Sequence, residues 1–389
     1  MLQTTRGERF AARLGVTLFD LLVYLIVLVL VAAIGLTAAF GLTDVREKII
    51  FLQMDERNVY ELWIADPDDP ASAQQITRTE AGVWDFDVSA DGQYVVYSMM
   101  DYSIGARDIF ILTLQTGESI PITDCAGGDA DCYAPRIHPD GRLIAYERAS
   151  MNSGSRVGIG APRIWLIDLD AGQTAPLVED AGGMVLGTDA VWSDDGSHLA
   201  FYDNSGANII VYRFADGSLR VVDSGMGVTG ALSPDGAYLI YPEISINRGF
   251  LRLFETETNL LRDVTDPGEL ADEQYAAWSP DGRYVAIGRR VGDGRGTQIY
   301  LLDIWNFNVT PLLIDRQYNH SAFQWNAESN QLVMTRFRLL NDDGSLATDS
   351  TQEAWVYNIE TRRLIRLSEP GQFVLNPQWI SAPHRIATP

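Results

Sequence analysis

Few residues in this sequence have the types and spacing that enzymatic chemistry requires. A serine hydrolase needs Gly-x-Ser-x-Gly at a strand-to-helix turn, and a zinc protease needs His-Glu-x-x-His; neither pattern occurs. The glycines of residues 292–296 superficially resemble a nucleotide-binding motif, but they fall between two predicted strands and do not precede a helix. The sequence therefore predicts no catalytic residue and no cofactor.

Two acidic loops carry oxygen-rich side chains of the kind that calcium prefers. They are residues 341–345 (Asn-Asp-Asp-Gly-Ser) and residues 124–131. Neither has the ligand spacing of a calcium-binding loop. The four histidines are dispersed among the repeats and leave little material for a zinc site. We therefore expect solvated loops and no bound metal.

Cys125 and Cys132 are the only cysteines, which is too few for a disulfide scaffold. They bracket residues 126–131 in a loop that precedes a predicted strand. If this part of the chain is exported, a disulfide that closes the loop is expected. Free thiols are the alternative.

The charge balance argues against one large class of partner. The chain has 29 Lys and Arg against 52 Asp and Glu, a formal net charge of -23. Such a surface repels the phosphates of nucleic acids, so no nucleic-acid partner is expected. The acidic residues are scattered through the loops, which favours a role in solubility.

Five copies of a short turn organise the rest of the chain. Residues 278–282 read Trp-Ser-Pro-Asp-Gly, Ser-Pro-Asp-Gly recurs at 233–236, and related turns occur at three more places. Pro suits the second position of a type I turn, and Gly accepts the left-handed φ of the last position. Alternating apolar residues follow each turn and predict a strand. We assign a structural role to the turn residues Asp91, Gly92, Asp140, Gly141, Asp195, Gly196, Asp235, Gly236, Asp281 and Gly282.

These aspartates recur about every 40–55 residues with four predicted strands per unit, which is typical of an all-β fold, the β-propeller. A sixth copy, residues 325–330, has Ser329 in place of Gly, which predicts a looser or differently shaped turn. The first unit lacks its first strand, and residues 376–380 supply one, so the last strand should complete the first blade and close the ring. The count gives seven four-stranded blades; six or eight stay open.

The repeated Trp-Ser-Pro-Asp-Gly and Ser-Pro-Asp-Gly turns resemble those of the TolB-type (PD40, WD40-like) β-propeller family, over Lys48 to Ile386. The resemblance implies a fold, because propellers host many unrelated functions. Family members include a soluble periplasmic protein of the Tol system and the accessory propellers of serine peptidases. This chain has an apparent membrane anchor and no appended domain, so a role in the Tol system is not carried over.

Residues 21–40 form an apolar run without a charge, which matches the ~20 helical residues that cross a bilayer. The predicted organisation is a cytoplasmic tail (1–13), a transmembrane signal anchor (14–42), a short linker (43–47), the propeller (48–386) and a tail (387–389). A cleaved signal peptide and a buried helix are the alternatives. Equal numbers of basic residues flank the two ends of the predicted transmembrane segment, but Arg13 lies nearest to it. This favours a cytoplasmic N-terminus and a propeller on the extracytoplasmic side of the cell membrane.

Loop length distinguishes the two faces of the predicted propeller. The turns that join first to second and third to fourth strands are mostly short and share one face. The second-to-third and fourth-to-first loops share the other face, and long ones are residues 124–134, 151–162, 179–189 and 338–353. Binding is usually placed on long loops of a rigid scaffold, so we expect a protein partner or small ligand there.

Two functions from different classes fit these features. The first is a membrane-anchored propeller that acts as a non-enzymatic binding or scaffolding module at the cell envelope. The second is a propeller enzyme, a hydrolase or lyase acting on glycan or peptide near the central channel, which carboxyl groups of raised pKa in that channel would favour. A sensor that signals inward is a third, but a tail of residues 1–13 is too small to hold a domain.

Overall fold

The computed structural model describes residues 45–151, 160–178, 185–245, 248–266, 271–292, 294–383 and 386–389. The expected N-terminal tail and membrane span lie outside these residues. Within the described part of the chain, no helix is long and apolar enough to cross a membrane. Residues 47–389 form one unit.

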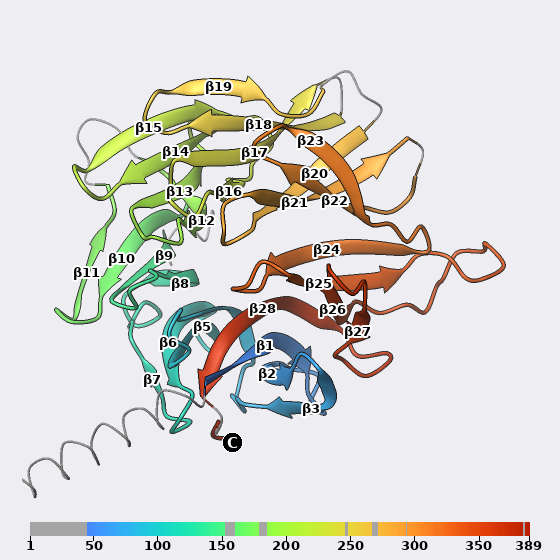
Figure 1. Cartoon of the computed structure of the whole chain (residues 1–389). Helices are drawn as coiled ribbons and strands as arrows, with labels where there is room; N and C mark the ends of the chain where they lie inside the picture. Colours follow the sequence, from blue (N-terminus) through green and yellow to red (C-terminus); the bar gives the residue numbers. More distant parts are fainter. Residues whose placement is uncertain are drawn as a thin grey trace, which may run out of the picture. The chain divides into compact units, whose positions relative to one another are not determined.

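The described strands form seven four-stranded antiparallel sheets arranged as the blades of a propeller (Figure 1). From the axis outwards, blade 1 is β28 (Val374–Pro383), β1 (Val45–Met54), β2 (Tyr60–Asp66) and β3 (Asp69–Gln75). Blade 2 is β4 (Val83–Val88), β5 (Tyr94–Asp101), β6 (Ala106–Thr113) and β7 (Ser119–Pro121). Blade 3 is β8 (Ala130–Ile137), β9 (Leu143–Ser150), β10 (Arg163–Asp168) and β11 (Gln173–Pro176).

The remaining blades follow in chain order. Blade 4 is β12 (Thr188–Trp192), β13 (His198–Asp203), β14 (Asn208–Arg213) and β15 (Ser218–Asp223). Blade 5 is β16 (Ala231–Leu232), β17 (Tyr238–Ser245), β18 (Arg248–Glu255) and β19 (Leu260–Asp263). Blade 6 is β20 (Ala271–Trp278), β21 (Tyr284–Val291), β22 (Gln298–Asp303) and β23 (Asn308–Leu313). Blade 7 is β24 (Tyr318–Trp325), β25 (Gln331–Arg338), β26 (Glu353–Asn358) and β27 (Leu364–Arg366).

The ring closes within blade 1, where the C-terminal strand β28 pairs with the N-terminal strand β1. This confirms the expected seven blades and the expected completion of the first blade by the last strand. The pairing covers the inner edge that β1 would otherwise expose. Strand β1 begins at Val45, three residues before the expected start at Lys48.

The hydrophobic core lies between neighbouring blades. Ile50 of blade 1 shares a buried cluster with Val95 and Leu112 of blade 2. Ile209 of blade 4 likewise shares a cluster with Leu239 of blade 5. Each sheet therefore buries apolar side chains against a neighbour, and removing apolar surface from water is what holds the blades together.

Tryptophans on four innermost strands add a directional bond to this packing. The indole N–H of Trp278 in blade 6 donates to the backbone carbonyl of Ala231 in blade 5 at 3.1 Å. Trp325 of blade 7 repeats the bond to Ala277 of blade 6 at 2.9 Å. The indoles of Trp192 and Trp379 make the same contact with the preceding blade. These four tryptophans therefore link each of their blades to the one before it.

The Asp-Gly turns are held by a repeated side-chain network. In blade 5 the Ser233 hydroxyl donates to Asp235 Oδ1 at 2.6 Å and accepts the backbone N–H of Tyr238 at 2.9 Å. The same carboxylate oxygen accepts the backbone N–H of Ala237. Ser-to-Asp bonds of this kind recur in blades 2, 4 and 6. The aspartate side chain therefore holds the turn in its conformation.

The turn of blade 7 corrects one expectation. Ser329 was expected to loosen it, yet Ser329 has a left-handed φ of 57° and its N–H donates to the Asn326 carbonyl at 3.0 Å, as the glycines do elsewhere. Asn326 Oδ1 accepts the backbone N–H groups of Asn330 and Gln331. A single asparagine thus replaces the Ser-Asp pair, and the turn keeps its shape.

The closure contact can be tested at two glycines that hold the same turn position. Gly92 and Gly141 have φ values of 67° and 74°, so alanine is strained at both. A Cβ on Gly92 would overlap the Ser381 carbonyl oxygen of β28, whereas nothing lies within 4 Å of one on Gly141. We expect Gly92→Ala to lower the free energy of unfolding by at least about 2 kcal/mol more than Gly141→Ala. Urea denaturation of the full chain measures this, and equal losses would contradict it.

Candidate functional site

A cavity of about 440 Å³ opens at the centre of the ring, on the face that carries the Asp-Gly turns. We call this the tight-turn face, and the opposite face, with the second-to-third and fourth-to-first loops, the long-loop face. The cavity is lined by the innermost strands, and its polar side chains include those of Glu47, Asp87, Arg136, Asp194, Gln324 and Gln378. Its size lies in the range of small-molecule sites.

The polarity of the central channel is uneven around the ring. One position recurs in every innermost strand, directly before the residue that is Trp in four blades. Blades 7, 1, 2 and 3, which are neighbours, carry polar side chains there, whereas blades 4, 5 and 6 carry small apolar ones. In ring order from blade 7 the residues are Gln324, Gln378, Asp87, Arg136, Val191, Ala231 and Ala277.

The two glutamines are oriented by bonds to neighbouring blades. Gln324 Oε1 accepts the backbone N–H of Trp379 at 2.9 Å, so the amide nitrogen is the end left for the channel. Gln378 Nε2 donates to the Phe86 carbonyl at 3.4 Å, so the amide oxygen of Gln378 is the end left for the channel. The channel therefore has one amide donor and one amide acceptor side by side in blades 7 and 1.

Two carboxyl groups in this cavity hold their protons more tightly than usual. Burial raises the pKa of Asp87, against the opposing charge of Arg136 and a bond from the Ile137 N–H at 2.7 Å. Burial also raises the pKa of Asp194, and the charge of Asp195 adds to the shift. A carboxyl group of raised pKa keeps its proton to a higher pH than usual, as a general acid must.

The long-loop face has a second polar cluster, in blades 2, 3 and 4. Arg107 pairs with Asp131 at 2.7 Å, and its guanidinium lies 3.9 Å from the centre of the Tyr133 ring. Glu147 is buried, and its Oε1 accepts the backbone N–H of Asp189 at 2.9 Å. Burial raises the pKa of Glu147 to about 7, while bonds from Asp189 and Tyr133 and the charge of Arg136 act against the shift.

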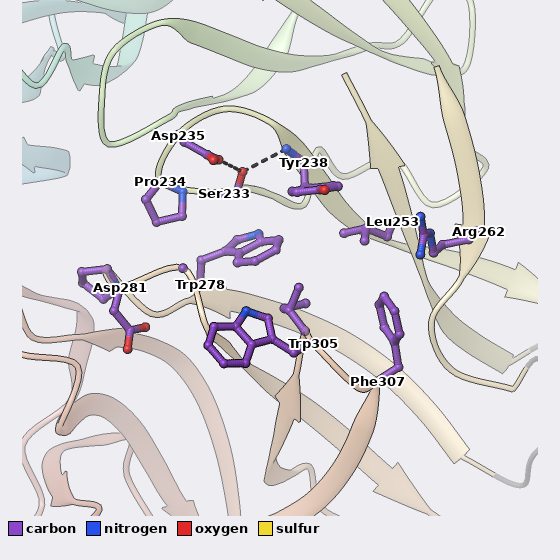
Figure 2. Close-up of a pocket in the computed structure, with 13 residues that line it drawn as sticks. Ser233, Pro234, Asp235, Tyr238, Leu253, Arg262, Trp278, Asp281, Trp305 and Phe307 are labelled. Atoms are coloured by element: carbon purple, nitrogen blue, oxygen red, sulfur yellow. Dashed lines mark hydrogen bonds between the residues drawn. The ribbon is translucent and has the colours of Figure 1, made fainter. Parts of the chain in front are cut away.

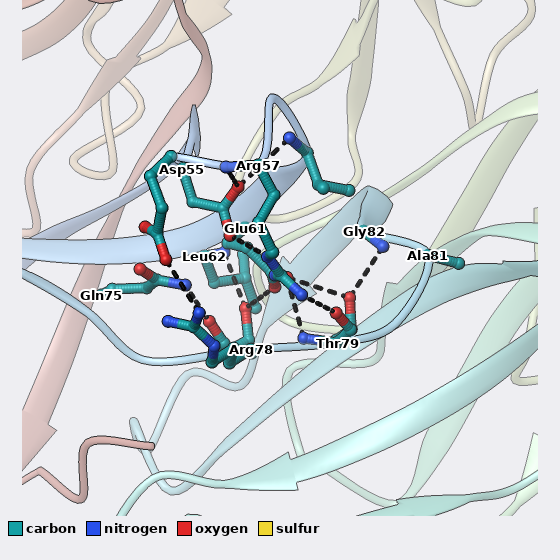
Figure 3. A network of polar contacts seen from close by, with 12 residues as sticks. Asp55, Arg57, Glu61, Leu62, Gln75, Arg78, Thr79, Ala81 and Gly82 are labelled. Atoms are coloured by element: carbon teal, nitrogen blue, oxygen red, sulfur yellow. Dashed lines mark hydrogen bonds and ion pairs between the residues drawn. The ribbon is translucent and has the colours of Figure 1, made fainter.

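A third network stiffens the long-loop face at blade 1 (Figure 3). Arg57 bridges the carboxylates of Asp55 and Glu61, each at 2.6 Å. Glu61 is fully buried and also accepts bonds from Thr77 and Thr79, which hold the loop between β3 and β4. Burial acts to raise the pKa of Asp55, but hydrogen bonds from Arg57 outweigh it and lower the pKa. These residues support the loops of blade 1.

The residues singled out in the sequence have mainly structural positions. Cys125 and Cys132 are joined by a disulfide that closes the loop leading into β8. The acidic loops are occupied by protein contacts, since Asp131 pairs with Arg107 and Asp342 with Arg338. Among the described residues, no group of three or more His, Cys, Asp or Glu side chains is arranged to hold a metal ion.

The four expected long loops are described to different extents. Residues 124–134 and 338–353 belong to the described part of the chain. Residues 152–159 and 179–184, which make up much of the other two loops, lie outside it. The site is therefore built from the first two loops and from the shorter connections beside them.

The turn aspartates and glycines do not converge on one site. Each pair serves its own blade, although Asp235 and Asp281 also line a common cleft between blades 5 and 6. The polar channel residues were missed by inspection of the sequence. A signal existed, because each is the residue directly before the Trp position in an aligned repeat.

Comparison with known proteins identifies the family. The model of the TolB beta propeller domain, PD40, matches residues 36–292. The chain belongs to this family. Among curated proteins, no sequence matches it. The expected family resemblance is thereby confirmed, and the anchor before the propeller remains a prediction.

Solved structures of similar fold serve different activities. A puromycin-hydrolyzing peptidase from Mycobacterium tuberculosis has a TM-score of 0.62 at 12% identity, covering 84% of this chain and 54% of that one. An oligogalacturonate lyase from Vibrio parahaemolyticus has a TM-score of 0.56 at 13% identity, and the match covers 84% of this chain and 85% of that one. The β-propeller domain of the Trilobed protease from Pyrococcus furiosus has a TM-score of 0.56 at 10% identity, and the match covers 83% of this chain and 94% of that one. At these identities the likeness shows the fold alone.

The Glu147 cluster predicts a pH-dependent stability. The folded-state pKa of about 7 exceeds the ordinary value of 4.5, so the folded protein binds more protons between these values and loses stability as pH rises through them. Glu147→Gln keeps an oxygen for the Asp189 N–H and removes the buried charge. At pH 8 we expect the variant to be more stable than the wild type by about 3 kcal/mol, and by little at pH 4.5. Urea unfolding at both pH values measures this, and a pH-independent difference would refute it.

Proposed function

We propose that this propeller is a membrane-anchored, non-enzymatic binding module at the cell envelope, and that it captures a protein partner through its long-loop face. The exposed apolar side chains of that face carry the proposal. Most of the large hydrophobic side chains that are exposed within the described ranges lie there: Trp84, Tyr102, Ile104, Val228, Ile244, Tyr275, Val291, Leu346 and Phe373. Exposed apolar groups concentrated on one face are typical of interaction surfaces.

Three loops of the long-loop face are held by internal bonds. Tyr102 is 71% exposed at the tip of the β5–β6 loop, where Asp101 accepts bonds from Ser103. The Cys125–Cys132 disulfide and the Arg57 network fix the two loops on either side of blade 2. Rigid presentation lowers the entropy cost of association. A disulfide is also what an exported domain would carry, which supports a location outside the cytoplasm.

The direction of the chain supports the same arrangement. Strand β1 starts on the tight-turn face, where Glu47 accepts hydrogen bonds from Asn326 and Ala327 in the turn of blade 7. The apolar residues 21–40 precede this point by only a short linker. A preceding anchor would thus join the propeller where β1 begins, at the tight-turn face.

The proposal predicts where a partner can be crosslinked in cells. A photoreactive amino acid at Tyr102 or Leu346 of the full-length protein should give an adduct of one common mass, whereas the same group at Asp216 on the tight-turn face should not. Tyr102→Glu combined with Leu346→Glu should reduce adduct formation from Val291 at least about tenfold, because charges would enter an apolar contact.

Both substituted side chains are exposed, so the melting temperature of the double variant should stay close to that of the wild type. Adducts from Asp216 as abundant as those from Tyr102 would contradict the proposed face. So would the absence of any adduct from Tyr102, Val291 and Leu346.

One observation favours a second candidate, a hydrolase or lyase acting on glycan or peptide in the central channel. Asp87 and Asp194 both have raised pKa values there, as expected for a general acid. The fold is shared with a lyase and a peptidase, so it is compatible with catalysis. In this role Asp87 would donate the proton to the leaving group.

The enzyme candidate predicts a specific loss. Full-length protein incubated with oligosaccharides or peptides should release reducing ends, unsaturated sugars or free amines, and the rate should fall as pH rises above the raised pKa of Asp87. Asp87→Asn should lower the rate about 100-fold or more. Asp349→Asn, which changes an exposed carboxylate in the β25–β26 loop, should not. No turnover of either substrate class would eliminate this candidate.

A further inference from the structure

A second, slightly larger cavity lies away from the channel, between blades 5 and 6 on the tight-turn face (Figure 2). Its volume is about 490 Å³, and the Asp-Gly turns of both blades form one wall. Figure 2 shows the indoles of Trp278 and Trp305 together in the cleft, with Phe307 and Arg262 toward one end and Asp281 toward the other. The cleft therefore combines aromatic rings with charged groups of both signs.

One wall of this cleft is a turn that departs from its counterparts in other blades. The third-to-fourth turn of blade 6 is Trp305-Asn306-Phe307, and the N–H of Phe307 donates to the Asp303 carbonyl at 2.8 Å. Equivalent bonds in blades 2, 4 and 5 come from Gly117, Gly217 and Asn259. All four residues have left-handed φ values, and Phe307 has φ 57°. Gly172 in blade 3 and Arg362 in blade 7 occupy the same place with φ values of 61° and 56°.

A bulky residue in the left-handed region is strained, and Gly or Asn relieves the strain. The turn itself therefore gives no reason for phenylalanine at 307, but packing does, because the ring packs against the buried cluster between blades 5 and 6. Packing gives no such reason for Trp305, which is 78% exposed. An exposed indole at one of several equivalent turns indicates a function for that side chain.

The aromatic side chains of the cleft are held in place. The indole N–H of Trp278 is bonded to Ala231, so this ring contributes only its apolar surface. Arg283 lies 5.0 Å from the centre of the Trp305 ring, and Arg262 lies 5.5 Å from the centre of the Phe307 ring. Cation–π contacts of this kind orient exposed rings.

The polar groups restrict what the cleft can hold. Asp235 Oδ1 and Asp281 Oδ1 are bonded within their own turns, so each carboxylate has its other oxygen for a ligand. Arg262 supplies donors. The two aspartates outnumber Arg262 and disfavour an anion. A wholly apolar ligand would strip water from all three charges without replacing it.

We propose that this cleft binds a neutral hexopyranose unit of a glycan. The C–H face of a sugar ring packs on an exposed indole, and its hydroxyl groups act both as donors to carboxylates and as acceptors from a guanidinium. A ligand of this class can therefore pack on the aromatic rings and hydrogen-bond to the carboxylates and the guanidinium at the same time. The site lies on the face opposite the long loops, so its loss and the loss of partner capture are separate outcomes.

The test is calorimetric titration of the full-length protein, in a detergent without a sugar head group, with cellotetraose, maltotetraose, mannotetraose and chitotetraose. At least one should bind with Kd below about 10 mM. Trp305→Ala should weaken that binding about tenfold or more, and Asp235→Asn with Asp281→Asn should weaken it by a similar factor. Trp84→Ala, which removes a half-exposed indole on the long-loop face, should leave it unchanged.

Because the aspartates also hold the turns, the melting temperature of each variant is measured alongside, and Trp305→Ala provides the decisive comparison. Trp305 lies in an exposed turn, so its removal should leave the melting temperature near that of the wild type. Failure of all four saccharides to bind would overturn the proposal. Binding that Trp305→Ala leaves intact would also overturn it, since the sugar would then occupy another site.

Discussion

The structure depends on closing the ring. Each blade has two apolar faces, and neither is covered unless a neighbouring blade packs against it. A linear stack would leave one apolar face of the first blade and one of the last blade exposed, whereas a ring covers both faces of every blade. Closure requires that blade 1 be completed by β28 from the opposite end of the chain, which removes the free inner edge of β1. The indole-to-carbonyl bonds of Trp192, Trp278, Trp325 and Trp379 then fix the inner strands of four of the seven neighbouring blade pairs relative to one another.

This architecture explains which features could be predicted from the sequence. The turn requires a left-handed residue and a side chain that accepts backbone N–H groups, and few residue types supply either. Ser-x-Asp-Gly is therefore visible and countable, and so is the strand that follows it. The prediction for Ser329 was wrong because it considered the glycine alone. The Asn326 side chain supplies the acceptor that Ser and Asp supply elsewhere, and the surrounding blade imposes the same backbone on Ser329.

The polar half of the channel could not be inferred in the same way. Asp87, Arg136, Gln324 and Gln378 are far apart in the sequence, and each resembles an ordinary strand residue. They become neighbours only because seven inner strands reach the axis in the same register. The pKa of Glu147 is hidden for a similar reason, since its burial and its bond to Asp189 depend on how blades 3 and 4 meet. Properties that belong to an interface between repeats are not visible within one repeat.

The two faces of the ring therefore differ in how freely the sequences of their loops can vary. On the tight-turn face, geometry restricts nearly every turn to small or polar residues, so an exposed Trp305 beside a strained Phe307 stands out from its counterparts. On the long-loop face no common turn is required, and loops there differ in length and carry exposed apolar side chains in several blades. A rigid ring is compatible with both arrangements, because changes in a surface turn leave the packing between blades intact. The fold can therefore carry two independent binding surfaces on one scaffold.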